Sequence, residues 1–258
     1  MQRGSVVDLR PWGASMFLPA EWRGEAKLIY ALREHYEPEL TYLAKMLRPG
    51  MTFVDAGANI GIYSVVASKI VGETGRVISI EPSVQTFPLL RKNIALNHLK
   101  NVNAFPLALS DRWGSTKLYH GPSACLNSFA RDSSWRGESE EVMTESLDQV
   151  LAETGIEQVD LIKIDVQGAE ELVLQGAIRT IRSMQPLIIL EVWPMGPELL
   201  GLPPFGACEL LENLGYNFFY FERDGTLIGT ISPPINRNVI AIHGHPRGWA
   251  LNRSAHEA

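Results

Sequence analysis

Two acidic residues of this chain have the spacing of a nucleoside-binding site. Asp55 follows the apolar run Phe53–Val54 and enters a turn that Gly57 and Gly61 bracket, and Glu81 stands 20 residues beyond Gly61. In α/β proteins, an acidic side chain at about this distance after a glycine turn accepts hydrogen bonds from ribose hydroxyls. Glycine also lets a ligand approach the backbone closely. The pattern therefore predicts a cofactor that contains adenosine, with Glu81 at the ribose.

The charge of the turn distinguishes between adenosine cofactors. A dinucleotide site carries G-x-G-x-x-G, so that the pyrophosphate lies at a helix N-terminus with no carboxylate beside it. Residues 55 to 61 instead read D-x-G-x-N-x-G, which favours a cationic ligand such as S-adenosylmethionine. The residues expected to hold its amino-acid end are Asp55, Gly57, Ala58, Asn59 and Gly61. The alternative is that Asp55 and Asn59 only cap the following helix.

Two further acidic residues follow later apolar strands. A predicted strand over residues 161 to 164 leads to Asp165, and another over residues 187 to 191 ends at Glu191. The carboxyl ends of parallel strands meet at one edge of a sheet, so both carboxylates are expected beside the cofactor. Methyl transfer from a sulfonium depends on alignment of the acceptor and gains from a general base. We expect Asp165 to be the base or the orienting group, unless it only caps the next helix, and Glu191 to be a second candidate.

Alternating strands and helices position these residues, in the order typical of a mostly parallel α/β sheet. A third strand over residues 102 to 107 ends at Ala108, which either contacts adenine or packs in the core. Lys163 lies inside a buried strand and is expected to pair with a carboxylate, because a lone buried charge is costly. Residues 35 to 37 precede the first of these strands. They either close over the cofactor, with Glu37 in contact, or have a structural role.

A long loop interrupts this alternation within residues 112 to 145. Two short strands are expected in that segment, at Thr116 to Tyr119 and at Glu141 to Thr144. Between them, residues 121 to 139 contain Ser, Gly and Arg, and a loop of this length is usually functional or disordered. We expect either a lid or acceptor-binding element, with Phe129 and Trp135 as substrate contacts, or an ordinary solvated loop.

Length and composition favour one ordinary globular domain: 258 residues, 45% hydrophobic and 20% charged. We expect a helical N-terminal segment over residues 1 to 50 that covers the cofactor crevice, a core over 51 to 243, and a tail over 244 to 258. The net charge of −6 and the lack of long Lys/Arg runs argue against a nucleic-acid partner. No apolar run approaches the roughly 20 residues that span a bilayer. Two separated cysteines and no secretory signal favour the cytoplasm, and no His/Asp cluster has metal-ligand spacing.

Taken together, the motifs resemble the FkbM-type family of S-adenosylmethionine-dependent methyltransferases, over residues 35 to 243. The segments that carry the resemblance are Phe53-Val54-Asp55-Ala56-Gly57-Ala58-Asn59-Ile60-Gly61, Glu81-Pro82, Ser146-Leu147-Asp148, Ile162-Lys163-Ile164-Asp165-Val166-Gln167-Gly168-Ala169-Glu170 and Leu190-Glu191-Val192. The resemblance implies a class I, Rossmann-like α/β fold, with helices on both faces of a seven-stranded, mostly parallel sheet whose last strand is antiparallel. It also implies methyl transfer to a hydroxyl group of a sugar, glycan or secondary metabolite.

One position departs from the family pattern. Similar proteins usually carry glutamate where this chain has Gln167, so a role as base or ion ligand is in doubt at that position. Pro82 and Ser83, which directly follow the ribose carboxylate, are assigned to the cofactor as well.

Two readings from other classes remain: a nicotinamide-dependent oxidoreductase, which the missing dinucleotide motif disfavours, and a non-catalytic protein that binds the nucleoside as a ligand. Carboxylates at both Asp55 and Asp165 argue against the second.

Overall fold

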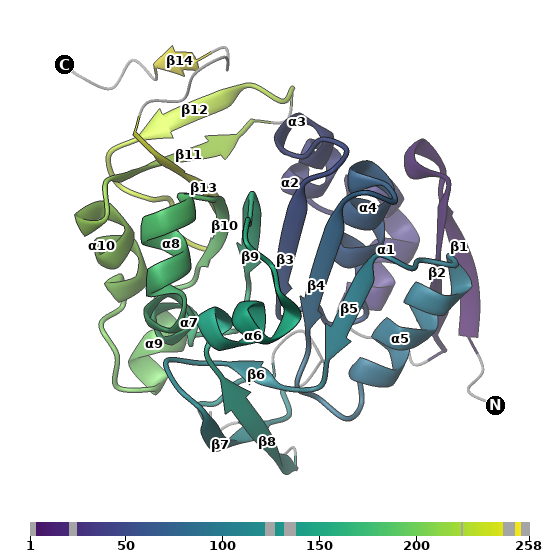
Figure 1. The fold of residues 1–258 in the computed structure, drawn as a ribbon, viewed down its shortest axis with the longest axis horizontal. Helices are drawn as coiled ribbons and strands as arrows, with labels where there is room; N and C mark the ends of the chain where they lie inside the picture. The colour runs from purple at the N-terminus through teal and green to yellow at the C-terminus, as the bar shows by residue number, and fades with distance from the viewer. Residues whose placement is uncertain are drawn as a thin grey trace.

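A nine-stranded sheet is the centre of the computed structural model, which describes residues 4–20, 25–121, 127–131, 138–222, 224–244 and 251–253. The strand order is β14-β12-β11-β13-β10-β9-β3-β4-β5 (Figure 1). The strands are β3 (Thr52–Ala56), β4 (Arg76–Ile80), β5 (Val102–Phe105), β9 (Leu161–Ile164), β10 (Leu187–Val192), β11 (Tyr216–Phe221), β12 (Leu227–Thr230), β13 (Arg237–His243) and β14 (Leu251–Arg253).

The strand directions confirm the predicted fold class. β5, β4, β3, β9 and β10 pair in parallel, and β13 pairs antiparallel with both β10 and β11. Beyond the seven predicted strands, β12 and β14 extend the sheet on the β11 side. β12 has only four residues and contains Gly229, so its sequence lacks an alternating pattern long enough to predict a strand.

Helices cover both faces of this sheet, and an apolar core fills each interface. Adjacent side chains of β3 point to opposite faces of the sheet, so Phe53 packs in one core cluster and Val54 in the other. On the Phe53 side lie α1 (Glu25–Leu32), α2 (Pro38–Thr41), α3 (Leu43–Met46), α4 (Ile62–Val71) and α5 (Phe87–Leu96). On the Val54 side lie α6 (Leu147–Thr154), α7 (Glu170–Gly176), α8 (Ile178–Met184) and α10 (Gly206–Asn213). α9 (Met195–Leu199) follows β10.

The N-terminal segment differs from the expected helical one. Residues 4–19 form a hairpin, β1 (Gly4–Leu9) and β2 (Ala14–Pro19), joined by the 3-10 helix η1 (Arg10–Trp12), and helices begin only at α1. Asn93 of α5 and Asn97, which caps the C-terminus of α5, hold the hairpin: Asn93 Oδ1 accepts from Phe17 N at 2.7 Å and Asn97 Oδ1 from Ser15 N at 2.8 Å. The strands are stabilised by partners about 80 residues away, which local sequence periodicity cannot reveal.

The segment within residues 112 to 145 forms a small three-stranded sheet at one end of the molecule (Figure 1). β7 (Gly114–Tyr119) and β8 (Ser139–Glu145) confirm the two strands predicted in this segment, and β6 (Ala108–Leu109), which precedes the segment, is the third strand of the sheet. In the loop between β7 and β8, Ser128 forms an isolated antiparallel bridge with Tyr119. Trp135, one of the two expected substrate contacts, lies outside the described residues.

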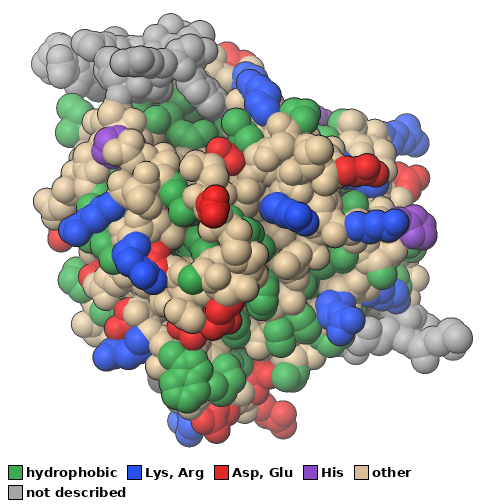
Figure 2. All heavy atoms as spheres, viewed as in Figure 1, with side chains coloured by type: hydrophobic (Ala, Val, Ile, Leu, Met, Phe, Trp, Pro, Cys, Tyr) green, Lys and Arg blue, Asp and Glu red, His purple; other side chains and the backbone are tan. Residues whose placement is uncertain are grey.

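The surface in Figure 2 carries basic and acidic side chains scattered among apolar and neutral ones. Among the helices that the structure describes, none is both long and apolar enough to cross a membrane.

Candidate active site

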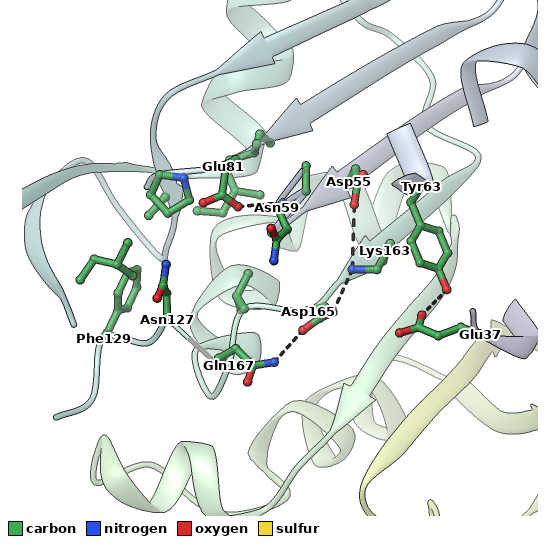
Figure 3. Close-up of a pocket in the computed structure, with 18 of the residues that line it drawn as sticks. Glu37, Asp55, Asn59, Tyr63, Glu81, Asn127, Phe129, Lys163, Asp165 and Gln167 are labelled. Atoms are coloured by element: carbon green, nitrogen blue, oxygen red, sulfur yellow. Dashed lines mark hydrogen bonds and ion pairs between the residues drawn. The ribbon is translucent and has the colours of Figure 1, made fainter. Parts of the chain in front are cut away.

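A pocket lies at the carboxyl ends of β3, β4 and β9, where parallel strands were expected to bring the acidic residues together (Figure 3). Its lining includes nine of the twelve residues that the sequence predicted for the site: Glu37, Asp55, Gly57, Ala58, Asn59, Glu81, Pro82, Ala108 and Asp165. Gly61, Ser83 and Glu191 are not among the described lining residues. Further lining residues are Tyr36, Tyr63, Ile80, Leu109, Leu118, Asn127, Phe129, Lys163, Val166 and Gln167.

The glycine turn after β3 fits tightly against the loop after β9. Gly57 has a φ of +77°, and a Cβ added to it would lie 2.0 Å from the backbone oxygen of Asp165. The N–H groups of Gly57 and Ala58 both donate to Ile80 O, which fixes the turn against β4. Gly61, with a φ of +92°, begins α4 behind the pocket. The turn thus requires glycine for its conformation and for the approach of two backbones.

Glu81 is held by three hydrogen bonds at the end of β4. Its Oε2 accepts from Asn59 N at 2.8 Å, and its Oε1 accepts from Ser83 N at 3.0 Å and Thr86 Oγ1 at 2.6 Å. Burial raises the pKa of Glu81, although these hydrogen bonds act in the opposite direction. A carboxylate offers about four acceptor positions, so one is left for a ligand. Ser83 therefore orients Glu81 and is not itself part of the pocket lining.

Lys163 is the centre of the charge cluster below the turn. Its side chain is only 4% exposed, and Nζ lies 3.1 Å from Asp165 Oδ2 and 4.0 Å from Asp55 Oδ1. Burial alone would lower the pKa of Lys163, but Asp165 and Asp55 together raise it above the ordinary value. The predicted pairing of this lysine with a carboxylate is confirmed. That Lys163 also lines the pocket was not predicted.

Asp55 and Asp165 respond differently to this shared lysine. Burial raises the pKa of Asp55, and its Oδ1 is buried without a hydrogen-bond partner, while its Oδ2 accepts from Ser64 Oγ at 2.6 Å. Burial also acts to raise the pKa of Asp165, but Lys163 and Gln167 outweigh it and lower the pKa below the usual range. Asp165 is therefore an ionised carboxylate that faces the pocket.

Gln167 connects Asp165 to the second predicted catalytic residue. Its Nε2 donates to Asp165 Oδ1 at 2.8 Å and to Glu191 Oε2 at 2.7 Å. Burial raises the pKa of Glu191 well above its ordinary value, and the negative charges of Asp165 and Glu170 raise it further. Glu191 thus stands behind Gln167 at the end of β10, and holds a proton to higher pH than an exposed glutamate.

The segment before α2 closes the other side of the pocket. Tyr36 and Glu37 belong to the lining, whereas His35 does not. Glu37 Oε2 accepts from Tyr63 Oη at 2.5 Å and from Asn238 Nδ2 at 3.2 Å, which ties this segment to α4 and β13 (Figure 3). Burial raises the pKa of Glu37. Tyr63 was not predicted from the sequence. It is one of many buried residues of α4, and nothing in its local sequence distinguishes it from its neighbours.

Fold and site together define a Rossmann-like α/β protein with a polar pocket at the carboxyl edge of its parallel strands. Residues 55–218 match the family described as the Methyltransferase FkbM domain. The chain therefore belongs to the FkbM methyltransferase family. It is an S-adenosylmethionine-dependent methyltransferase, which sets aside the readings as a nicotinamide oxidoreductase and as a non-catalytic binding protein.

The chain is also similar to individual proteins. The chain is 32% identical over 185 residues to 31-O-demethyl-FK506 methyltransferase FkbM of Streptomyces tacrolimicus, covering 59% of this chain and 69% of the relative. It is 28% identical over 194 residues to Methyltransferase sdnD of Sordaria araneosa, covering 64% and 73%. The crystal structure of Methyltransferase FkbM from Methylobacillus flagellatus KT aligns with a TM-score of 0.49 at 16% identity, over 88% of this chain and 56% of the other.

Proposed function

We propose that this methyltransferase transfers the methyl group of S-adenosylmethionine to a hydroxyl group of a small molecule, glycan or secondary metabolite. The observation that carries the proposal is Asp165, an ionised carboxylate that lines the pocket and is fixed by Lys163 and Gln167. Such a group accepts a hydrogen bond from a hydroxyl donor. The Streptomyces relative is named for methylation at an oxygen of FK506, which supports the same acceptor group.

The residues around the glycine turn fit the cofactor. Asp55 Oδ1 is buried and accepts no hydrogen bond, although Lys163 Nζ lies 4.0 Å away, so it is an acceptor suited to the ammonium of the amino-acid end, with Gly57, Ala58 and Asn59 beside it. Glu81 keeps one acceptor position for the ribose hydroxyls. Two further lining residues, Pro82 and Ala108, complete the assignment to the adenosine end, and Glu37 is assigned to the amino-acid end.

The mechanism assigns orientation to Asp165 before proton removal. When bound, S-adenosylmethionine would supply an electrophilic methyl group: the acceptor oxygen would bond to the methyl carbon as the carbon–sulfur bond breaks, S-adenosylhomocysteine would leave, and the hydroxyl proton would pass to a carboxylate or to water. Orienting the acceptor is worth on the order of 7 to 11 kcal/mol, whereas a general base contributes about 10²- to 10⁴-fold in rate. The lowered pKa of Asp165 makes it a weak base but keeps it an acceptor at neutral pH. Asp165 therefore aligns the hydroxyl. Glu191, which is connected to Asp165 through Gln167, is the second candidate for the general base.

A labelling experiment tests this proposal. The protein is incubated with methyl-labelled S-adenosylmethionine and a panel of hydroxylated sugars, glycans and secondary metabolites, and labelled products are identified by mass spectrometry. We expect an O-methylated product, and labelling exclusively at nitrogen or carbon would overturn the acceptor assignment. With the product known, Asp165→Asn should lower turnover at least about 100-fold, on the scale of a lost positioned proton acceptor.

Two controls separate catalysis from folding and binding. Asp160→Asn changes an aspartate just before the same strand, where Oδ2 accepts from Thr52 N, and should leave turnover near the original value. Calorimetric titration with S-adenosylhomocysteine should give a similar affinity for Asp165→Asn and for the unmodified protein. Glu81→Ala should instead weaken that affinity, and an unchanged affinity would remove Glu81 from the ribose.

A further inference from the structure

The side-chain amide of Gln167 joins the two carboxyl groups that the catalytic proposal uses. Both Nε2 hydrogen bonds, to Asp165 Oδ1 and to Glu191 Oε2, are shorter than 2.9 Å, and the residue is only 9% exposed. Its backbone is held in the left-handed region with a φ of +56°. The backbone carbonyl oxygen of Gln167 accepts from Ser128 Oγ at 2.7 Å, so the loop between β7 and β8 also holds this residue in place.

We propose that Gln167 is a positioning residue that holds Asp165 and Glu191 as a pair sharing one proton, with Asp165 ionised toward the pocket. This inference rests on the proposed function. An amide nitrogen has two hydrogens, and here each is donated to a different carboxyl group. Two carboxyl groups that accept from one nitrogen lie close enough for the negative charge of one to raise the pKa of the other, and Asp165 does raise the pKa of Glu191.

The surrounding charges decide which carboxyl group keeps the proton. Lys163 Nζ contacts Asp165 Oδ2 at 3.1 Å and stabilises its ionised form. Glu191 lies toward Glu170 of α7, whose Oε1 caps the same loop by accepting from Val166 N and Gly168 N. Glu170 adds negative charge near Glu191 and so favours the protonated state of Glu191.

The remaining charged groups near the pair have the same effect. Asp55 of β3 and Glu37 before α2 both face Asp165 across the pocket and share its lysine, so they oppose a second ionised carboxylate. Lys163 and Glu170 are the other charged groups with a marked effect on the pair. The proton is therefore expected on Glu191, and the Gln167 amide keeps both carboxyl groups in place.

A glutamate at position 167 would reverse this effect. It removes both donated hydrogens and adds a third carboxyl group beside Asp165 and Glu191. The pKa of Asp165 should then rise by about one unit or more, the scale on which a neighbouring carboxylate shifts a carboxyl pKa. Gln167→Met, which keeps the length of the side chain without its donors, should shift the pKa in the same direction by a smaller amount.

Carbon-13 labelling of the Asp and Glu carboxyl groups gives the test. The full-length protein is titrated with S-adenosylhomocysteine present, and signals are assigned with Asp165→Asn and Glu191→Gln. We expect Asp165 to titrate below the usual aspartate range and Glu191 far above the usual glutamate range. Gln167→Glu and Gln167→Met should raise the Asp165 midpoint. Gln175→Met is the matched control, because Gln175 Nε2 donates to Glu171 Oε1 at 2.9 Å on an exposed helix face.

The outcomes are distinguishable from those of the proposed function. Equal midpoints for Asp165 in the unmodified protein and in a folded Gln167→Met or Gln167→Glu variant would overturn the positioning role. If Gln167→Met fails to fold, Gln167→Glu still provides the comparison, and a variant that folds without binding S-adenosylhomocysteine is compared with the unmodified protein in the absence of that ligand. Because the titration needs no acceptor, its result does not depend on whether the methylated group is a hydroxyl.

Discussion

Replacing Lys163 by methionine tests the electrostatics of the whole site. Methionine is close to lysine in length and is apolar, so Lys163→Met removes the charge with little change in packing. In the native protein, Lys163 Nζ is 3.1 Å from Asp165 Oδ2 and 4.0 Å from Asp55 Oδ1, and its side chain is 4% exposed. The variant therefore leaves two buried carboxyl groups without their cation.

The expected destabilisation follows from these distances. With an effective dielectric constant of about 20, the two attractions are worth about 5 kcal/mol for Asp165 and about 4 kcal/mol for Asp55. The cost of burying the lysine is recovered in the variant, so the net loss is smaller than the sum of the two attractions. Breaking a buried pair by removing one partner costs about 3 to 5 kcal/mol. We expect a loss in this range at pH 8.

The loss should depend on pH in a defined direction. Without Lys163, burial raises the pKa of Asp165 and Asp55 in the folded state above the unfolded value, so the folded variant binds more protons than its unfolded chain. Its stability then falls as pH rises between the two values. Each pH unit changes the cost of protonating one carboxyl group by about 1.4 kcal/mol, so the deficit should be about 3 kcal/mol smaller at pH 5.5 than at pH 8.

Urea denaturation at the two pH values measures this deficit for Lys163→Met. Lys100→Met, at an exposed lysine, is the control, and its free energy of unfolding should stay within about 0.5 kcal/mol of the unmodified protein at both pH values. A deficit for Lys163→Met below about 1 kcal/mol would mean that water screens the pair as on a surface. A deficit equal at both pH values would refute the assigned charge states.

Two further substitutions test the turns that form the pocket. Gly57→Ala should cost more than about 3 kcal/mol and abolish binding of S-adenosylhomocysteine, since its Cβ would lie 2.0 Å from Asp165 O. Gly155→Ala, at a left-handed position with nothing within 4 Å, should cost only about 1 to 2 kcal/mol for its positive φ, and similar losses for the two variants in denaturation experiments would contradict the close approach. Burial raises the pKa of Glu170 to about 7, so folding stability from this group decreases as pH rises from about 4.5 through 7. Glu170→Gln, whose amide oxygen still accepts from Gly168 N, should gain up to about 3 kcal/mol relative to the native chain between pH 5 and 8.5, and parallel stability curves would refute it.

The convergence of Asp55, Glu81 and Asp165 could be predicted because strand direction alone brings these residues together. Each follows an apolar strand, and the carboxyl ends of parallel strands share one edge of the sheet. The sequence also assigned Ser83 to the cofactor, but Ser83 N donates to Glu81 Oε1 and the residue does not line the pocket. Glu81 and Ser83 are thus close in sequence but differ in role, because one lines the pocket and the other holds it in place. The direction of the backbone decides which residue lines the pocket, and residue spacing does not determine that direction.

Residues from outside the parallel strands could not be assigned in the same way. Asn127 reaches the pocket from the loop between β7 and β8, and Tyr63 from α4. Their positions depend on how distant segments pack, as with the hairpin of residues 4–19 held by Asn93 and Asn97. Lys163 did carry a signal, since a charge inside an apolar strand needs a partner. The signal identified the ion pair and not the pocket that the pair faces.

The charge balance of the pocket connects its architecture with its cofactor. Among the described lining residues, four are acidic, namely Glu37, Asp55, Glu81 and Asp165, and Lys163 is the single base. Burial raises the pKa of the first three, which means that water no longer stabilises their ionised forms. A ligand with ammonium and sulfonium groups restores that stabilisation, and methyl transfer removes the sulfonium charge. In the binding mode proposed above, the same carboxylates would therefore favour the charged substrate form of the cofactor over its product.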